Sequence, residues 1–442
     1  MKPIKLADIQ QMEMRYLNKP IQRVVRRALV KNSISDIAYV NERETATQFK
    51  FSIDIETLPA TNQQASGRCW LFAGLNVLRE LVANKLNLKD FEFSQNYQAF
   101  WDKFEKINFF LESMDDFLEV DSDDRTLKHL LQLGIQDGGQ WDMFVSLIDK
   151  YGVVPKAAMP ETHASAHTGQ MNRFINIKLR QYAARVRTLA QNGKHSEVFV
   201  LKAKTLEELY GFLVTNFGVP PKQVDFEYVT KHNIYRKVSN LTPQAFYNEF
   251  CETDLNDYVS IINSPTSDKS FMKSYTIDYL GNVIGGRSIK HLNLEMDRLV
   301  ELTVNQLKDK EIVWFGSDVA FYGDRAKGIW DDQAYAYDQT FEMDFNMTKA
   351  ERLEYSQGQM NHAMVITGVN LDSDKPTKWK IQNSWGQDKG LKGYYLMSQS
   401  WFNEHTYQSV IHKKYLSNKE LEAYESKPIH LKPWDPMGSL AK

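Results

Sequence analysis

Gln63-Gln64-Ala65-Ser66-Gly67-Arg68-Cys69-Trp70 is the stretch of sequence on which the fold and the chemistry of the chain depend most. Ser66-Gly67 favours a turn, and apolar residues then recur at helical spacing, at Leu71, Phe72, Leu75, Leu78, Leu81 and Val82. This pattern predicts that Cys69 lies in the first turn of a buried helix. A helix N-terminus lowers the pKa of a thiol, and the thiolate is the nucleophilic form. The alternative is that Cys69 is simply a small buried hydrophobic residue.

Gln63 strengthens the nucleophile hypothesis for Cys69. It lies six residues before Cys69, so a turn can bring its side-chain amide beside the thiol. Acyl transfer requires hydrogen-bond donors directed at the developing oxyanion. The Gln63 amide and the backbone N–H of Cys69 would supply two such donors.

Two segments near the C-terminal end offer a base and a residue to orient it. His362 begins an apolar run, His362-Ala-Met-Val-Ile-Thr-Gly368, which has the character of a strand. Asn383 ends the alternating stretch Trp379-Lys-Ile-Gln-Asn383 and precedes Ser384-Trp385-Gly386. An Asn383 amide oxygen could hold one imidazole nitrogen so that the other meets the thiol, and Trp385 would shield that bond from water. Taken singly, His362 could be structural or solvated, and Asn383-Ser384 could mark a turn.

The three segments together resemble the papain-like cysteine peptidases, specifically the bleomycin hydrolase and bacterial aminopeptidase C branch. The resemblance rests on Gln63, Ser-Gly-Arg-Cys-Trp around Cys69, the His362 strand and Asn383-Ser-Trp-Gly. It implies an α+β, papain-like fold with a helical left part and a β-barrel-like right part. His362 follows Cys69 by 362 − 69 = 293 residues, far beyond the roughly 130–150 of papain and the cathepsins. A large helical insertion is therefore expected.

Periodicity supports that organisation. Apolar residues at steps of three and four predict a helical hairpin between about 168 and 217, and a third helix near 290–308. Strands are predicted at 312–315, 363–369, 379–382 and 394–397. No internal repeat divides the chain. We expect a single peptidase unit over 1–442, with an approximate helical insertion, or hook, at 155–260.

Composition limits the function classes. The chain has 442 residues and a formal net charge of −2, which offers no global attraction to nucleic acid or to anionic lipid. It has no apolar segment of bilayer length and no secretory signal, so a cytoplasmic protein without membrane contact is expected. Only Cys69 and Cys251 occur, which suits a reducing compartment. Cys251 follows an aromatic, amphipathic stretch and is interpreted as core packing. No metal cluster or nucleotide loop is evident, so no cofactor is expected.

The C-terminal segment 427–442 carries three prolines and no helical period, which indicates an extended arm rather than a helix. It could also be a frayed terminus. Its ending is similar to the tail of the bleomycin hydrolase family, and the resemblance implies that the arm reaches the active site. The terminal residues, Ala441 and Lys442, would then anchor the α-ammonium of a substrate. Because a terminal Lys would bring a cation close to that ammonium, we hypothesise that Lys442 is trimmed to expose Ala441.

The resemblance predicts a cysteine-type aminopeptidase of broad specificity that acts on peptides through a thioester and assembles as a homohexamer. If the arm does not occupy the cleft, the chain would be an endopeptidase. The segment 168–196 holds six basic residues and no acidic one, which leaves open a nucleic-acid-binding shell with secondary peptidase activity. An intersubunit contact or a solvated face is the preferred interpretation of that segment. Acyl transfer to an amine instead of water is a weaker alternative.

Overall fold

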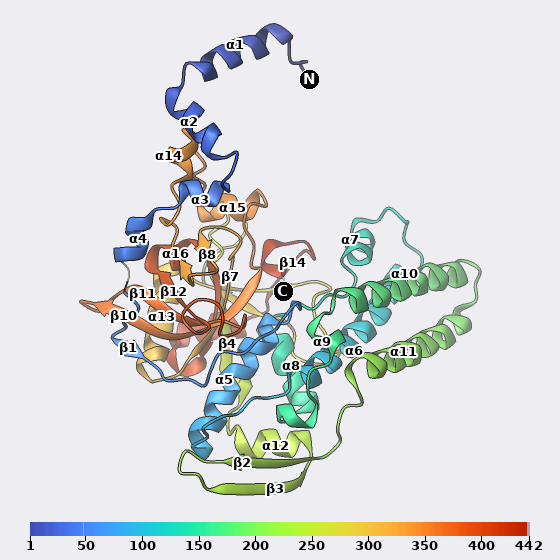
Figure 1. Cartoon of the computed structure of the whole chain (residues 1–442). Helices are drawn as coiled ribbons and strands as arrows, with labels where there is room; N and C mark the ends of the chain where they lie inside the picture. Colours follow the sequence, from blue (N-terminus) through green and yellow to red (C-terminus); the bar gives the residue numbers. More distant parts are fainter. Residues whose placement is uncertain (47, 440–442) are drawn as a thin grey trace.

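The computed structural model describes residues 1–46 and 48–439. Of its N-terminal helices α1 (Leu6–Leu17), α2 (Pro20–Ala28), α3 (Ile34–Ala38) and α4 (Asn41–Ala46), the first two extend away from the body, whereas α3 and α4 lie against it (Figure 1). None of the residues of α1 is buried. Over the described residues, no helix is both long and apolar enough to cross a membrane.

A mainly helical part follows, running from Cys69 to residue 257. Its helices are α5 (Cys69–Leu86), α6 (Gln95–Ser113), η1 (Met114–Phe117), α7 (Arg125–Leu133), α8 (Trp141–Tyr151), η2 (Lys156–Ala158), α9 (His163–Ala166), α10 (Gly169–Gln191), α11 (His195–Phe217), α12 (Pro243–Phe250) and η3 (Leu255–Asp257). A separate hairpin, β2 (Val224–Val229) with β3 (Tyr235–Leu241), precedes α12. Figure 1 shows α10 and α11 side by side, extending away from the sheet.

The described residues also form a 12-stranded sheet in the order β14-β5-β6-β4-β13-β7-β10-β11-β12-β9-β8, with β1 paired to β10. The strands are β1 (Ile53–Asp54), β4 (Tyr258–Ile262), β5 (Lys273–Ile277), β6 (His291–Asn293), β7 (Val313–Ser317), β8 (Gly323–Asp324), β9 (Ile329–Trp330), β10 (His362–Asp372), β11 (Lys375–Gln382), β12 (Tyr394–Ser398), β13 (Thr406–His412) and β14 (Ile429–Leu431). The remaining helices are α13 (Met296–Lys308), α14 (Tyr337–Phe341), α15 (Lys349–Glu354), α16 (Gln399–His405), η4 (Lys413–Tyr415), α17 (Asn418–Glu425) and η5 (Pro436–Gly438).

Strand β10 is buried on both faces, and this decides how the layers meet. Ala363 and Val365 belong to the hydrophobic cluster that contains α5, whereas Met364 and Ile366 belong to a second cluster with α13 and α16. Alternate side chains of a strand point to opposite faces of its sheet. The sheet is therefore covered by α5 and the helical part on one face and by α13 and α16 on the other. This explains why the His362 segment is almost continuously apolar.

Several elements lie where the sequence predicted them. The helix at Cys69 is α5, and the two helices predicted between 168 and 217 are α10 and α11. The four predicted strands correspond to β7, β10, β11 and β12. The mixed α and β class is confirmed.

The prediction of a helix near 290–308 was wrong about where the helix begins. It begins at Met296, because His291–Asn293 form strand β6, which pairs with β4 and β5. Leu292 fits a helical stripe in sequence, but it is fully buried in the sheet. Sheet pairing across distant segments overrode the local period. The hairpin β2–β3 lies within 155–260, so this expected helical region also contains strands.

Helix α5 packs closely on α8, and this contact yields a stability prediction. A Cβ atom added at Gly74 of α5 would lie 2.9 Å from the Phe144 ring of α8. Overpacking of this kind costs about 1–3 kcal/mol, and most of this range exceeds the ~1 kcal/mol that Ala gains over Gly inside a helix. We expect Gly74→Ala to lower the thermal midpoint by about 1–3 °C, measured by scanning calorimetry.

Gly211 in α11 is the matched control, since an added Cβ there meets no atom within 4 Å. Gly211→Ala should leave the midpoint unchanged or raise it. Equal midpoints for the two variants would contradict the proposed close packing of α5 on α8.

Candidate active site

The N-terminus of α5 meets the start of β10, and this contact brings Cys69 and His362 together. Cys69 is the first residue of α5, and its Sγ accepts a hydrogen bond of 3.4 Å from the backbone N–H of Ala363. Ala363 directly follows His362 in β10. Cys69 is fully buried, and His362 is 2% exposed. Cys69 and His362, 293 residues apart in sequence, are thus brought together through Ala363 in a shielded site.

Asn383 fixes the imidazole in one tautomer. His362 Nε2 lies 2.8 Å from Asn383 Oδ1, and the backbone N–H of Ser384 donates to the same Oδ1, also at 2.8 Å. A backbone N–H can only donate, so the shared atom must be the amide oxygen. His362 Nε2 must then carry the proton. Its Nδ1 is left as the acceptor that a thiol proton requires.

Trp385 covers the histidine–asparagine pair. Its ring stacks on the His362 ring with centroids 4.7 Å apart and an interplanar angle of 26°. The Arg325 guanidinium carbon lies 5.0 Å from the centroid of the Trp385 ring. Trp385 therefore covers one face of the His362 ring.

The Gln63 side-chain amide is held in one orientation by Ser384 and Ser66. Its Oε1 accepts a hydrogen bond from Ser384 Oγ at 2.6 Å, and its Nε2 donates to the Ser66 carbonyl at 2.5 Å. Its backbone N–H also donates to the Ser384 carbonyl, at 2.9 Å. A carbonyl can only accept, so the nitrogen and the oxygen of the Gln63 amide are distinguished. The bond to Ser66 uses one of the two N–H groups of Nε2.

Burial shifts both titratable groups of the site toward their neutral forms. It raises the pKa of the Cys69 thiol to about 12, although the backbone N–H groups of Ala363, Trp70 and Cys69 itself act in the opposite direction. It lowers the pKa of His362 to about 4, against the hydrogen bond of Asn383, which favours the imidazolium. A single charge is thus costly here. Direct transfer of the thiol proton to His362 creates two opposite charges that stabilise each other.

Asp137 supports the turn before Cys69, and sequence reasoning missed it. Its Oδ2 accepts a hydrogen bond of 2.9 Å from the backbone N–H of Gly67, and its Oδ1 forms an ion pair of 2.5 Å with Lys103. Thr168 and Asn172 also donate to this carboxylate. Burial alone would raise the pKa of Asp137, but Lys103 and these donors hold it well below its usual range. The Asp137-Gly-Gly turn was visible in the sequence, but its partner was not.

The C-terminal arm passes beside the site. The Ser439 carbonyl accepts a hydrogen bond of 2.8 Å from Gln140 Nε2, and Ser439 Oγ donates to the Met360 carbonyl at 2.7 Å. Met360 lies two residues before His362, so the arm at Ser439 is close to the catalytic candidates. The candidate amine anchors Ala441 and Lys442 lie outside the described residues.

Cys251 lies apart from this arrangement. It is 3% exposed at the end of α12, and it packs in the aromatic part of the hydrophobic cluster that contains α5. Burial raises the pKa of its thiol to about 12. The prediction that Cys251 is a core residue is confirmed. Both cysteines are free thiols.

A cysteine at the start of a helix, bonded to the strand that begins with a histidine held by an asparagine, on a mixed α and β scaffold, is typical of the papain-like class of cysteine peptidases. Comparison with known proteins gives the family. The chain belongs to the Peptidase C1-like family, whose model matches residues 3–438.

The relatives of the chain span nearly its whole length. It is 47% identical over 421 residues to Aminopeptidase C of Lactococcus lactis subsp. cremoris, covering 95% of each chain. It is 44% identical over 438 residues to Aminopeptidase C of Listeria innocua, covering 99% of each. The crystal structure of PepW from Lactobacillus rhamnosis superposes with a TM-score of 0.98 at 44% identity, covering 99% of each chain. The chain therefore lies within the aminopeptidase C group of its family.

The burial of Cys69 predicts how its reactivity depends on His362. We expect His362→Gln, made in a Cys251→Ala background, to leave Cys69 as a thiol of raised pKa. Its rate of reaction with methyl methanethiosulfonate should fall at least tenfold near neutral pH. It should then rise about tenfold per pH unit up to pH 10, because thiolate forms only by titration.

The parent protein, with His362 intact, is the control and should react at a rate that changes little between about pH 6 and 8, because the proton passes to His362. Stopped-flow measurement of thiol modification checks both profiles. A His362→Gln variant with the rate and the pH profile of the parent would contradict a thiol–imidazole pair.

Proposed function

We propose that the chain is a cysteine-type aminopeptidase with broad specificity for peptides, acting through Cys69, His362 and Asn383. The observation that carries this proposal is the hydrogen bond between His362 Nε2 and Asn383 Oδ1 beside the Cys69 thiol. That bond leaves His362 Nδ1 free to take the thiol proton. The names of the relatives, Aminopeptidase C, support the same activity.

The reaction follows from these groups. His362 takes the thiol proton of Cys69, and Sγ attacks the carbonyl carbon of the first peptide bond. Negative charge develops on the carbonyl oxygen, where Gln63 Nε2 and the backbone N–H of Cys69 donate hydrogen bonds. His362 then gives its proton to the leaving nitrogen as the C–N bond breaks. Water, deprotonated by His362, hydrolyses the thioester and restores the thiol.

We propose that the arm 427–442 limits cleavage to the N-terminal residue of the substrate. Strand β14 pairs in parallel with β5, and Asp435 forms an ion pair of 2.8 Å with the buried Lys269. The Arg125 guanidinium carbon lies 3.9 Å from the centroid of the Trp434 ring. An arm held at these points and at Ser439 can present its terminal carboxylate to the α-ammonium of a substrate. This supports an exopeptidase over an endopeptidase.

Truncation before Trp434 tests the role of the arm. The full chain should cleave an amino-acid arylamide at least tenfold faster than its N-acetylated twin, because acetylation removes the ammonium charge. The truncated chain should lose this preference while Cys69 still reacts with methyl methanethiosulfonate. Steady-state kinetics with both substrates checks the prediction.

Two outcomes would contradict the proposed role of the arm. A full chain that cleaves both substrates equally would favour an endopeptidase. A truncated chain that keeps the free-amine preference would mean that another part of the cleft recognises the ammonium.

The nucleic-acid alternative rests on the basic segment 168–196, and intramolecular contacts weaken it. Arg180 donates to the carbonyls of Leu131 and Gln132, and Arg187 donates to those of Phe117 and Val120. Lys178 forms an ion pair with Glu208. These side chains already have partners on their own chain, so they are poorly placed to bind phosphates. We propose a structural role for this segment instead.

We further propose that 155–260 is an insertion into a papain-like core with a barrel-like right part, that it contributes to a homohexamer, and that the protein is cytoplasmic. We also expect Lys442 to be removed, so that Ala441 carries the terminal carboxylate. Mass spectrometry tests the proposed homohexamer and the removal of Lys442. Native spectra should contain six chains, and denaturing spectra should give a chain shorter by one Lys. Fully active protein that retains Lys442, or that is monomeric, would overturn the corresponding proposal.

A further inference from the structure

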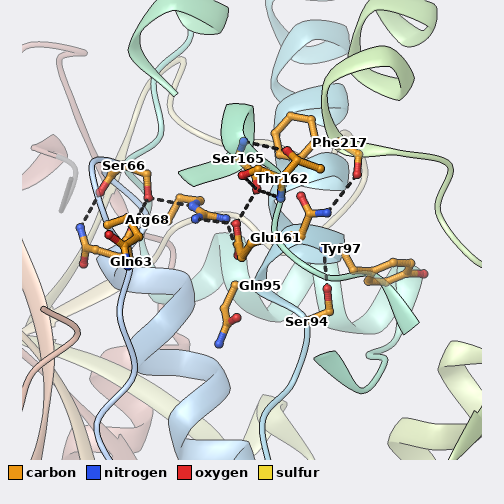
Figure 2. A network of polar contacts seen from close by, with 12 residues as sticks. Gln63, Ser66, Arg68, Ser94, Gln95, Tyr97, Glu161, Thr162, Ser165 and Phe217 are labelled. Atoms are coloured by element: carbon orange, nitrogen blue, oxygen red, sulfur yellow. Dashed lines mark hydrogen bonds and ion pairs between the residues drawn. The ribbon is translucent and has the colours of Figure 1, made fainter. Parts of the chain in front are cut away.

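Arg68 is a buried charge directly before the candidate nucleophile. It is 1% exposed, and its guanidinium forms two parallel hydrogen bonds of 3.0 Å with the Glu161 carboxylate. A bidentate pair fixes both distance and orientation. Figure 2 shows Arg68 between Ser66 on one side and Glu161 on the other. Glu161, the partner of Arg68, lies about ninety residues further along the chain.

The third contact of Arg68 leads to the oxyanion donor. Arg68 Nε donates to Ser66 Oγ at 2.9 Å, and Ser66 Oγ donates to the backbone carbonyl of Gln63 at 2.6 Å. Gln63 Nε2 in turn donates to the Ser66 carbonyl at 2.5 Å. Ser66 and Gln63 thus form a closed ring of two hydrogen bonds, and Arg68 holds that ring from outside.

Glu161 is itself fixed in place by the start of α9. Ser165 Oγ donates to the Glu161 carboxylate, and Ser165 is fully buried. Thr162 and Ser165 cap each other's backbone N–H groups, at 3.1 and 2.8 Å. Thr162 Oγ1 also donates to the Asn216 carbonyl at the end of α11. The position of the carboxylate is therefore set by α9 and α11, not by the turn it supports.

We propose that Glu161 is a positioning residue for catalysis, which acts through Arg68 and Ser66 to hold the Gln63 amide at the oxyanion. This inference rests on the proposed function, since it assigns Gln63 to that oxyanion. Loss of the Glu161 charge leaves Arg68 buried without a counter-ion, and its guanidinium must turn toward water. The bond to Ser66 is then lost and the ring with Gln63 loosens. An oxyanion donor stabilises the transition state only within about 2.7–3.1 Å.

Glu161→Gln tests the proposal by steady-state kinetics with an amino-acid arylamide. We expect kcat to fall about 10–100-fold, a loss of the size that a 1 Å misplacement produces, with KM changed less than about twofold. The rate of Cys69 modification by methyl methanethiosulfonate, which has no carbonyl group, should stay within about threefold of wild type. A merely structural defect would change thiol reactivity and thermal stability together.

Arg298 and Glu420 supply the matched control. They also form a bidentate pair, at 2.6 and 2.9 Å. Glu420 belongs to the capping box of α17, whereas Glu161 accepts a hydrogen bond from Ser165 of the capping box of α9. They lie on α13 and α17, which carry none of the proposed site residues. Glu420→Gln should leave kcat within about twofold of wild type. An equal loss of kcat in Glu161→Gln and Glu420→Gln would overturn the proposal.

Ser66→Ala is the second variant, because it removes the hydroxyl that links Arg68 to Gln63 and leaves the Arg68–Glu161 ion pair intact. It should reproduce the loss of kcat, and the double variant with Glu161→Gln should be no worse than the poorer single variant. Losses that multiply, or full kcat in Ser66→Ala or Glu161→Gln, would overturn the proposal. Inactive wild-type protein, or a fully active Cys69→Ala variant, would instead refute the proposed function.

Discussion

The contact between the first turn of α5 and the first residues of β10 is the constraint on which the site depends. It joins Cys69 to Ala363 through a hydrogen bond and brings His362 beside the thiol. Both groups are buried, so neither can carry a charge alone at neutral pH without a large desolvation penalty. The two groups can be charged together, because the thiolate and the imidazolium attract each other and this offsets the loss of hydration. Burial disfavours the charged form of each group alone, and it therefore favours direct proton transfer between them.

The scaffold around this contact is built to keep it rigid. β10 lies inside the sheet and is packed on both faces, so its N-terminal end has little freedom to move. Asn383 and Trp385 follow the neighbouring strand β11: Asn383 accepts a hydrogen bond from His362 Nε2, and Trp385 stacks on the His362 ring. Ser384, between them, orients the Gln63 amide. One short segment after β11 thus serves both the base and the oxyanion donor.

The turn before Cys69 is tied to the helical part by two carboxylates. Asp137 accepts the backbone N–H of Gly67, and Glu161 pairs with Arg68. Both are held by residues near the starts of α9 and α10. Each of these contacts is buried or partly buried, where hydrogen bonds to charged groups are stronger than in water. The helices from 163 onward therefore support the active-site turn directly, in addition to any role in assembly.

The sequence by itself determined the chemistry that could be read from local patterns. Helical spacing after Cys69 predicted α5, and strand-like runs predicted β7, β10, β11 and β12 but not the other strands. The peptidase class came from the resemblance of the segments around Gln63, Cys69, His362 and Asn383 to a known family. These features depend on neighbouring residues, so a linear pattern records them. The tertiary structure alone decided which distant groups meet: β6 instead of a helix at His291–Asn293, Asp137 at Gly67, and Glu161 at Arg68. Such contacts join residues far apart in sequence, and the energy of burying and pairing them depends on the whole fold, which no local period encodes.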